Sequence, residues 1–208
     1  YGVMNARFTD VDNNILNYSS WSVDAQHSSE FTKLAFEWEY RKLFQSNRQL
    51  NLRFYAGKFL RNKTESDFFS FALDRPTDYM FDLAYLGRSE SSGIYSQQVI
   101  IAEGGFKSKL ENPFANDWIA TTNASTNIWR WVEAYGDLGF LKNKGDNPRF
   151  VYDSGIRLNL VTDYFELYFP MYSNRGWEIG QDDYGQRIRF IVTISPRTLI
   201  GLFTRKWL

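Results

Sequence analysis

The residue types that could do catalytic chemistry in this chain gather around His27, the only histidine. In the run His27-Ser28-Ser29-Glu30, a base, hydroxyl groups and an acid stand side by side, as in the triad of a hydrolase. Neighbouring side chains on an extended chain point in opposite directions, so these groups cannot form the relay that activates a nucleophile. A histidine without a catalytic role is therefore the favoured interpretation.

Other patterns that would hold a metal or a phosphate group are missing from the sequence. It has no cysteine, no His-Glu-x-x-His motif and no Gly-x-Ser-x-Gly elbow. The pair Gly104-Gly105 lacks the lysine and the following helix of a phosphate-binding loop, so it marks a turn or a bulge. One histidine cannot supply the ligands of a zinc site. We therefore predict no catalytic residue, no cofactor site and no metal site in this chain.

Charged residues that alternate with apolar residues form the strongest pattern in the sequence. From Lys33 to Phe44, apolar side chains fall on one face of a strand and charged side chains on the other, because strand side chains alternate. The same alternation recurs in most of the strands that the sequence indicates. The apolar residues predicted to face outward, into lipid, are Phe36, Trp38, Phe54, Leu158, Leu167 and Phe190. The charged residues predicted to face inward are Glu37, Glu39, Arg53, Glu133, Arg157, Arg187 and Arg189.

Two architectures could position these side chains. In a soluble sandwich, the aromatic face would line a core and the charged face would meet water. In an outer-membrane barrel, the sheet closes on itself with aromatic side chains in lipid and charges inside. Alternation in nearly every strand favours the barrel, and the runs approach the roughly 9–11 residues that a tilted strand needs to cross the hydrocarbon. The predicted fold class is all-β, an antiparallel transmembrane β-barrel of about eight to ten strands.

The inward charges indicate a filled barrel and not a selective pore. Acidic and basic residues balance in this set, and buried charges must be paired or solvated. We therefore expect the inward residues to form a shared ion-pair network that plugs the lumen of a narrow barrel.

The composition agrees with a membrane barrel and excludes other classes. Aromatic residues make up 18% of the 208 residues, with 7 Trp, 13 Tyr and 18 Phe. Interface girdles of barrels use Trp and Tyr in quantity. Lysine and arginine number 24, as do aspartate and glutamate, so no basic excess points to nucleic acid as a partner. The sequence contains no apolar run of about 18 or more residues, as a spanning helix would require.

The chain divides into three predicted parts. Residues 1–30 are expected to be an irregular or strand-forming segment, residues 31–194 the outer-membrane barrel, and residues 195–208 a short amphipathic helix at the periplasmic side. Ser195-Pro196 can begin a helix, since serine caps and proline suits the first turn. Apolar side chains between Leu199 and Trp207 would then lie on one side, at the membrane interface. A frayed terminal strand is the alternative.

Several strings of the sequence resemble a known family. They are Tyr95 to Gln98, Glu103 to Lys107, Tyr152 to Leu160, Asp163 to Pro170, Arg187 to Phe190 and Leu202 to Trp207. Together they look like the C-terminal end of a group of gluzincin-type metallopeptidases from Bacteroidetes-like bacteria. The resemblance implies a zinc-dependent, aminopeptidase-like region that precedes a C-terminal membrane region. The zinc ligands would lie in that preceding region, so none is assigned to a residue of this chain.

Three hypotheses about function follow. In the first, the chain is the membrane-anchoring barrel of a larger zinc metallopeptidase; a first residue other than Met and no signal peptide favour it. In the second, the chain is a stand-alone small barrel that serves as a subunit of an envelope complex. In the third, it is a barrel enzyme in which His27 pairs with Asp182 or Asp183. All three predict the bacterial outer membrane as location and its lipid as partner, with other outer-membrane subunits as further candidates.

Overall fold

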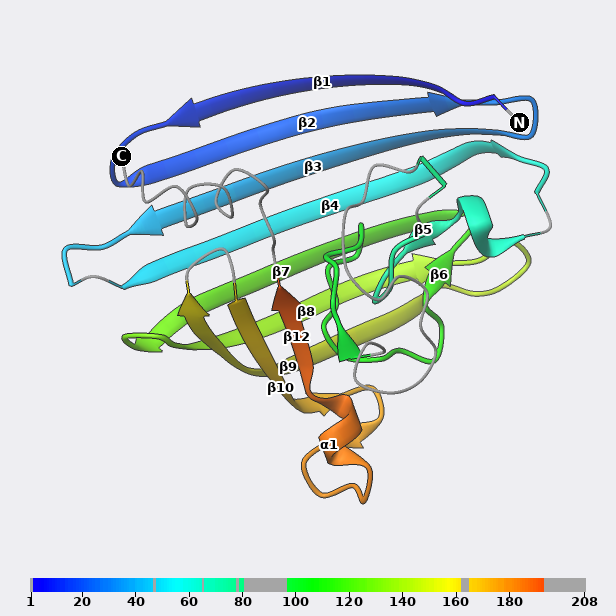
Figure 1. Ribbon diagram of the computed structural model, residues 1–208. Coiled ribbons are helices and arrows are strands. Elements are labelled where there is room, and N and C mark those ends of the chain that lie inside the picture. Colours follow the sequence, from blue (N-terminus) through cyan, green and yellow to red (C-terminus); the bar gives the residue numbers. More distant parts are fainter. Residues whose placement is uncertain are drawn as a thin grey trace, which may run out of the picture.

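The computed structural model shows a mostly β protein built on one large antiparallel sheet of ten strands (Figure 1). It describes residues 2–46, 48–64, 66–77, 79–80, 97–161 and 165–192. The all-β, antiparallel part of the predicted fold class is therefore confirmed. The alternation of Phe81, Leu83 and Tyr85 with Asp82 and Ala84 also predicts a strand. This segment and the amphipathic tail 195–208 lie outside the described residues.

Eight long strands and two short ones make up this sheet. The long strands are β1 (Met4–Asn13), β2 (Asn17–His27), β3 (Phe31–Leu43), β4 (Gln49–Asn62), β7 (Trp118–Trp129), β8 (Val132–Lys142), β9 (Arg149–Val161) and β10 (Phe165–Ser173). They pair in this order, each antiparallel to the next. The short strands β11 (Gly176–Trp177) and β12 (Arg189–Val192) both pair with β10. Because β1 pairs with β2 and β2 pairs with β3, the strands before residue 31 belong to the same sheet as those after it.

The connection from β4 to β7 packs against one face of this sheet. It contains the short 3-10 helix η1 (Asp67–Phe69) and a small second sheet of β5 (Phe71–Ala72) and β6 (Phe114–Ala115). A side chain at Gly57 would meet the ring of Phe71 at 2.5 Å, and one at Gly139 would meet Thr121 at 2.7 Å and Phe106 at 3.2 Å. Glycine at these two strand positions therefore lets the connection approach the backbone closely. We call the face that it covers the inner face.

An apolar cluster fills part of the inner face. Phe31, Phe71 and Leu73 are fully buried in it, together with Phe106 and Ile119. The rings pack edge to face, as aromatic pairs prefer; the centroids of Phe59 and Phe71 are 5.0 Å apart with planes at 62°. This cluster attaches the connection to β3, β4 and β7.

The opposite, outer face carries large apolar side chains that remain exposed. Register places Phe36 of β3 beside Val23 and Ala56, and Leu138 of β8 beside Thr122 and Tyr152. The exposed fraction is 38% for Phe36 and 54% for Leu138. Other exposed members of this face are Phe8, Leu34, Phe140 and Phe150. Since cross-strand partners share a face, these side chains form one apolar surface that extends from β1 to β9.

The pairings of the described residues do not close the sheet into a barrel. One edge is β1, all of whose residues are exposed. At the other side, β12 and β11 take up separate parts of β10, and Gln98 forms a parallel bridge to Phe190. Among the described residues, no helix is both long and apolar enough to span a bilayer.

Candidate functional site

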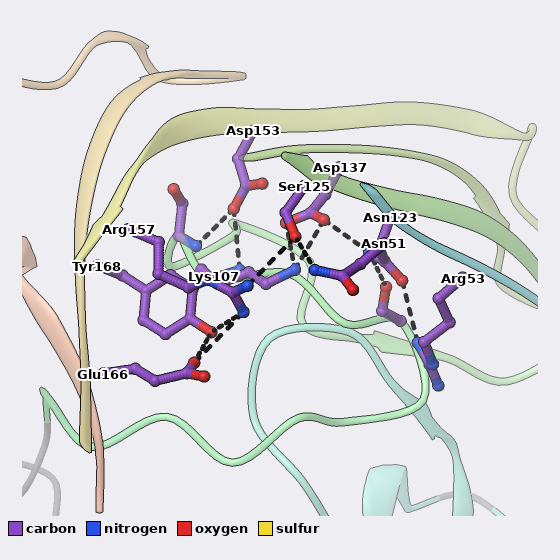
Figure 2. Close-up of polar contacts among 12 residues, drawn as sticks. Asn51, Arg53, Lys107, Asn123, Ser125, Asp137, Asp153, Arg157, Glu166 and Tyr168 are labelled. Carbon is purple, nitrogen blue, oxygen red and sulfur yellow. Dashed lines mark hydrogen bonds and ion pairs between the residues drawn. The ribbon is translucent and has the colours of Figure 1, made fainter. Parts of the chain in front are cut away.

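The polar residues of the inner face lie in rows that cross neighbouring strands. One row consists of Arg53 on β4, Asn123 on β7, Asp137 on β8 and Asp153 on β9, each the cross-strand partner of the next. The alternation of strand side chains turns all four toward the inner face. Register thus gathers residues that lie up to a hundred positions apart in the sequence into one polar group (Figure 2).

Lys107, from the inserted connection, occupies the centre of this group. Its Nζ donates to both carboxylate oxygens of Asp137, at 2.8 and 2.9 Å. The backbone amides of Lys107 and Ser108 donate to Oδ2 of Asp153, at 3.0 and 2.6 Å. Asp137 is fully buried and Asp153 is 2% exposed. The connection therefore supplies a cation to the buried carboxylate of Asp137 and two backbone hydrogen bonds to one oxygen of the buried Asp153 carboxyl group.

Arg53 and Asn123 hold the neighbouring turn of the connection. Arg53 Nη1 donates to the carbonyl oxygen of Glu103 at 2.9 Å, and Asn123 Nδ2 donates to that of Gly104 at 3.1 Å. Gly105 follows with φ of 74°, where a side chain would meet Asn123 at 2.6 Å. Glycine is required there both by the backbone conformation and by the close approach.

Arg157 organises a second polar group on β8, β9 and β10. It pairs with Glu133, with Nε at 3.1 Å from Oε2, and its Nη1 lies 3.4 Å from Oε2 of Glu166. It also donates to the hydroxyl groups of Ser125 and Tyr168, at 3.3 and 3.4 Å. One guanidinium group thus neutralises two partly or fully buried carboxylates.

The residues predicted to form one ion-pair network are distributed among separate groups. Arg53 contacts Glu37, with 2.5 Å between Nε and Oε1, and Arg157 contacts Glu133. Glu39 lies on the inner face beside Arg53 but has no ion pair with any residue that the structure describes. The remaining two arginines, Arg187 and Arg189, lie on α1 (Tyr184–Arg187) and β12, where Arg189 is the strand partner of Tyr168.

Arg187 binds carboxylates of its own neighbourhood. It pairs with Glu178, which is 2% exposed, and its Nε lies 2.9 Å from Oδ1 of Asp183. The hydrogen bonds from Arg187 lower the pKa of the Asp183 carboxyl below its ordinary value. Glu178 in turn accepts a hydrogen bond from Ser173 at the end of β10. Glu178 therefore links Arg187 of α1 to the end of β10.

Several members of the site were not among the predicted residues, and Lys107, Asn123 and Asp153 are examples. Lys107 comes from a segment without strand periodicity, so no pattern in the sequence places it on the inner face. Asp153 could have been found, because it alternates with Tyr152 and Ser154 on a run that reads as a strand.

A cavity of about 330 Å³ lies beside these groups. Its wall includes Arg53 and Lys107, amide side chains of Asn51 and Asn159, and the ring of Tyr135. A second cavity, of about 310 Å³, lies between β2, β3 and the connection and is lined in part by Asp24, Lys33 and Glu103. Both cavities have many polar and charged residues in their walls, in contrast to the apolar outer face.

His27 stands apart from all of these groups. It is exposed at the end of β2, and its Nδ1 lies 2.8 Å from the hydroxyl of Thr32. Asp183, one of the proposed acid partners, instead contacts Arg187. Within the described ranges, no three metal-ligating side chains of the types His, Cys, Asp and Glu come together as a metal site would require.

The outward residues of the prediction also have defined positions. Phe36 and Phe54 contact each other on the outer face, with ring centroids 6.3 Å apart, and Trp38 is the strand partner of Phe54. Leu158 and Leu167 are partners on β9 and β10, and Leu167 is also the partner of Phe190. All six therefore share the face that bears the exposed apolar surface.

Comparison with known proteins finds no family model, no curated protein and no solved structure that matches this chain.

Proposed function

We propose that this chain is an integral outer-membrane β-barrel and that it anchors a larger zinc metallopeptidase-like protein, of which it is the C-terminal part. On this account the chain contains no catalytic site. Its sheet closes around the inner-face polar groups, and its outer face contacts the lipid of the bacterial outer membrane. The inserted connection fills the interior, so the barrel is an anchor and not a channel.

The observation that carries the membrane part is the inverted distribution of polar and apolar residues over the sheet. Asp137, Asp153 and Glu133 are at most 3% exposed on the inner face, whereas Leu138 and Phe140, on the same strand as Glu133 and Asp137, are at least 50% exposed on the outer face. A soluble protein rarely exposes a contiguous apolar surface of this extent. Alternation of apolar outward and polar inward residues along each strand is the arrangement of a membrane barrel.

Rows of residues at one end of the outer face also fit a membrane boundary. Lys58, Trp118 and Lys142 are cross-strand partners, and Asp117 lies 3.6 Å from one lysine and 3.5 Å from the other. Tryptophan and charged side chains next to an apolar band are typical of the interface between lipid and water.

The peptidase part of the proposal is supported by the family resemblance of the sequence alone. It implies that a zinc-binding region precedes the barrel and that its ligands are not in this chain.

The anchoring proposal predicts a division of properties between this chain and the region before it. The isolated 208 residues should fractionate with membranes and dissolve only in detergent, and they should bind no zinc stoichiometrically and hydrolyse no peptide. In the longer protein, His27→Ala should leave peptidase turnover unchanged, because His27 contributes no ligand or base. Fractionation, metal analysis and peptidase assays on both proteins measure this. Stoichiometric zinc binding or peptidase turnover by the isolated chain would contradict the proposal. If the native protein consists of these 208 residues alone, the chain is a stand-alone barrel and not an anchoring part.

A further inference from the structure

Three hairpin turns at one end of the sheet carry exposed apolar side chains, although surface turns are usually polar. They join β1 to β2, β3 to β4 and β7 to β8, at the left in Figure 1. Ile15 is 97% exposed in the first turn, Phe44 is 41% exposed in the second and Trp131 is 52% exposed in the third. Leu16 and Trp129 are exposed beside them. We call these three turns the apolar turns.

Hydrogen bonds join the apolar turns into one edge of the molecule. The Leu43 amide donates to the Leu16 carbonyl oxygen at 2.8 Å, which joins the first turn to the end of β3. The Gln49 amide donates to Asn127 Oδ1 at 2.9 Å, which joins the start of β4 to the end of β7. Asn127 Nδ2 also donates to the carbonyl oxygen of Arg130 at 3.0 Å, within the third turn. The apolar side chains are therefore presented together at one end of the sheet.

The turns at the opposite end of the sheet are polar. The turn between β2 and β3 is Ser28-Ser29-Glu30, and the turn between β8 and β9 contains Lys144, Asp146 and Asn147. Neither turn contains a large apolar side chain. Water at both ends would favour polar turns at both ends, so the asymmetry indicates that the two ends have different surroundings.

Basic residues accompany the apolar side chains. Arg48 of the second turn and Arg130 of the third are exposed, and none of the three turns contains an acidic residue. Neither arginine forms a salt bridge with any residue that the structure describes. Lys42, at the end of β3, has its Nζ 5.3 Å from the centre of the Phe44 ring. The acidic Asp12 of β1 stands beside the first turn, so the positive charge is concentrated at the second and third turns.

The length of the strands places the apolar turns at a membrane boundary. β7 has 12 residues, from Trp118 in the boundary row at the opposite end to Trp129 beside the third turn. A tilted strand needs roughly 9–11 residues to cross the hydrocarbon of a bilayer. If Trp118 lies at one interface, the apolar turns therefore lie at the other.

The combination of residue types in these turns matches the chemistry of that boundary. Tryptophan and large aliphatic side chains among basic residues are typical of segments that enter the region between lipid headgroups and acyl chains. A long basic side chain beside them keeps its charge at the level of the headgroups. Arginine binds a phosphate group through two parallel hydrogen bonds. The excess of positive charge favours lipids whose headgroups carry a net negative charge.

From these observations we infer that the apolar turns bind the headgroup region of an anionic membrane, with Ile15, Phe44 and Trp131 among the upper acyl chains. Arg48 and Arg130 bind the lipid phosphates. This inference rests on the proposed membrane location of the chain, and it adds the class of lipid and the residues that bind it. The two claims can be tested separately, because the apolar turns and the middle of the outer face can carry separate labels.

Quenching of a fluorophore at Ile15→Cys by labelled lipid tests this inference on the full chain. The chain is folded into vesicles of phosphatidylcholine and phosphatidylglycerol, in which one of the two lipids carries a nitroxide group near the top of its acyl chain. The position suits a label because Ile15 is 97% exposed. Phosphatidylglycerol with the nitroxide should quench more strongly than phosphatidylcholine with the nitroxide at the same mole fraction. A roughly fivefold enrichment of the anionic lipid at each arginine is expected from the worth of one basic residue near an anionic surface.

A paired substitution tests the role of the two arginines. Arg48→Gln with Arg130→Gln removes both charges and keeps polar side chains, so the two nitroxide lipids should quench the Ile15→Cys label equally. Lys63→Gln with Lys144→Gln is the matched control, since it removes the same charge from exposed residues at the opposite end of the sheet. This control should keep the preference for phosphatidylglycerol.

Several results would overturn the inference. Equal quenching by the two lipids with unaltered arginines would do so, as would quenching by neither. A label that enters an apolar environment without lipid, and more so at higher protein concentration, would assign the apolar turns to contact between copies of the chain. A label at Leu138→Cys reports separately on the barrel. Quenching at Leu138 but not at Ile15 would keep the barrel and refute this inference, whereas quenching at Ile15 alone would keep the lipid-binding turns and refute the barrel.

Discussion

Lys107→Ala should destabilise this protein by roughly 3–5 kcal/mol, because it leaves buried carboxyl groups without their cation. Asp137 is fully buried and has its two oxygens at 2.8 and 2.9 Å from the Lys107 ammonium group. Asp153 is its cross-strand partner, so without the lysine two buried acids would face each other. The free energy of unfolding, from reversible urea titration in detergent micelles, measures the loss.

Two further variants separate this effect from a general loss of charge. Lys109→Ala removes the same charge two residues along the connection, where the side chain is exposed, and should change stability by no more than about 0.5 kcal/mol. The double variant Lys107→Met with Asp137→Leu should recover much of the stability, since an apolar pair needs no compensation. Equal losses for Lys107→Ala and Lys109→Ala would show that the buried pair does not hold the connection in place.

Leu138→Arg should cost about 2–4 kcal/mol if the outer face lies in lipid. Leu138 lies at the middle of β8 and is 54% exposed, so the arginine would be placed near the centre of the bilayer. In water the same substitution at an exposed position would change stability by only about 0.5 kcal/mol. Folding into phospholipid vesicles, followed by urea titration, distinguishes the two environments.

Ile128→Arg is the matched control for this experiment. Ile128 is 53% exposed, almost the same as Leu138, but it lies near the end of β7. In a membrane barrel, arginine near the interface should cost only about 0–1 kcal/mol. Similar small effects at both positions would contradict a lipid-facing outer surface.

The alternation in the sequence was sufficient to predict much of the sheet. The run from Lys33 to Phe44 coincides with β3, which spans Phe31–Leu43. Alternation with a period of two residues is a local signal, so it can be recognised in a single sequence. It also places Arg53 and Glu37 on one face, where the structure joins them.

The inserted connection could not be predicted in the same way. Phe71, Leu73 and Phe106 follow no strand or helix period, and they are buried through contacts with strands far along the chain. Lys107 lies 30 residues from Asp137, so only the folded sheet brings the two together. Interactions of this kind depend on tertiary packing, which overrides local preference.

The pairing of Arg187 also depended on tertiary structure. Its position two residues before Arg189 gave both the same expected face, as on a continuous strand. In the structure, β12 begins only at Arg189, and Arg187 ends α1. The change of local structure between them turns Arg187 toward Glu178 and Asp183 instead of toward the other predicted inward residues.

The most direct measurement of the central claim is the environment of the outer face. The chain contains no cysteine, so single cysteines can be introduced and labelled with an environment-sensitive fluorophore without background. Labels at Leu138→Cys and Phe36→Cys, both near the middle of long strands, should emit as in hydrocarbon and be quenched by lipids with nitroxide groups in their acyl chains. A label at Asp146→Cys, in the exposed turn after β8, should emit as in water and escape quenching. If all three labels report water and none is quenched, the outer face does not lie in lipid and the barrel proposal is wrong.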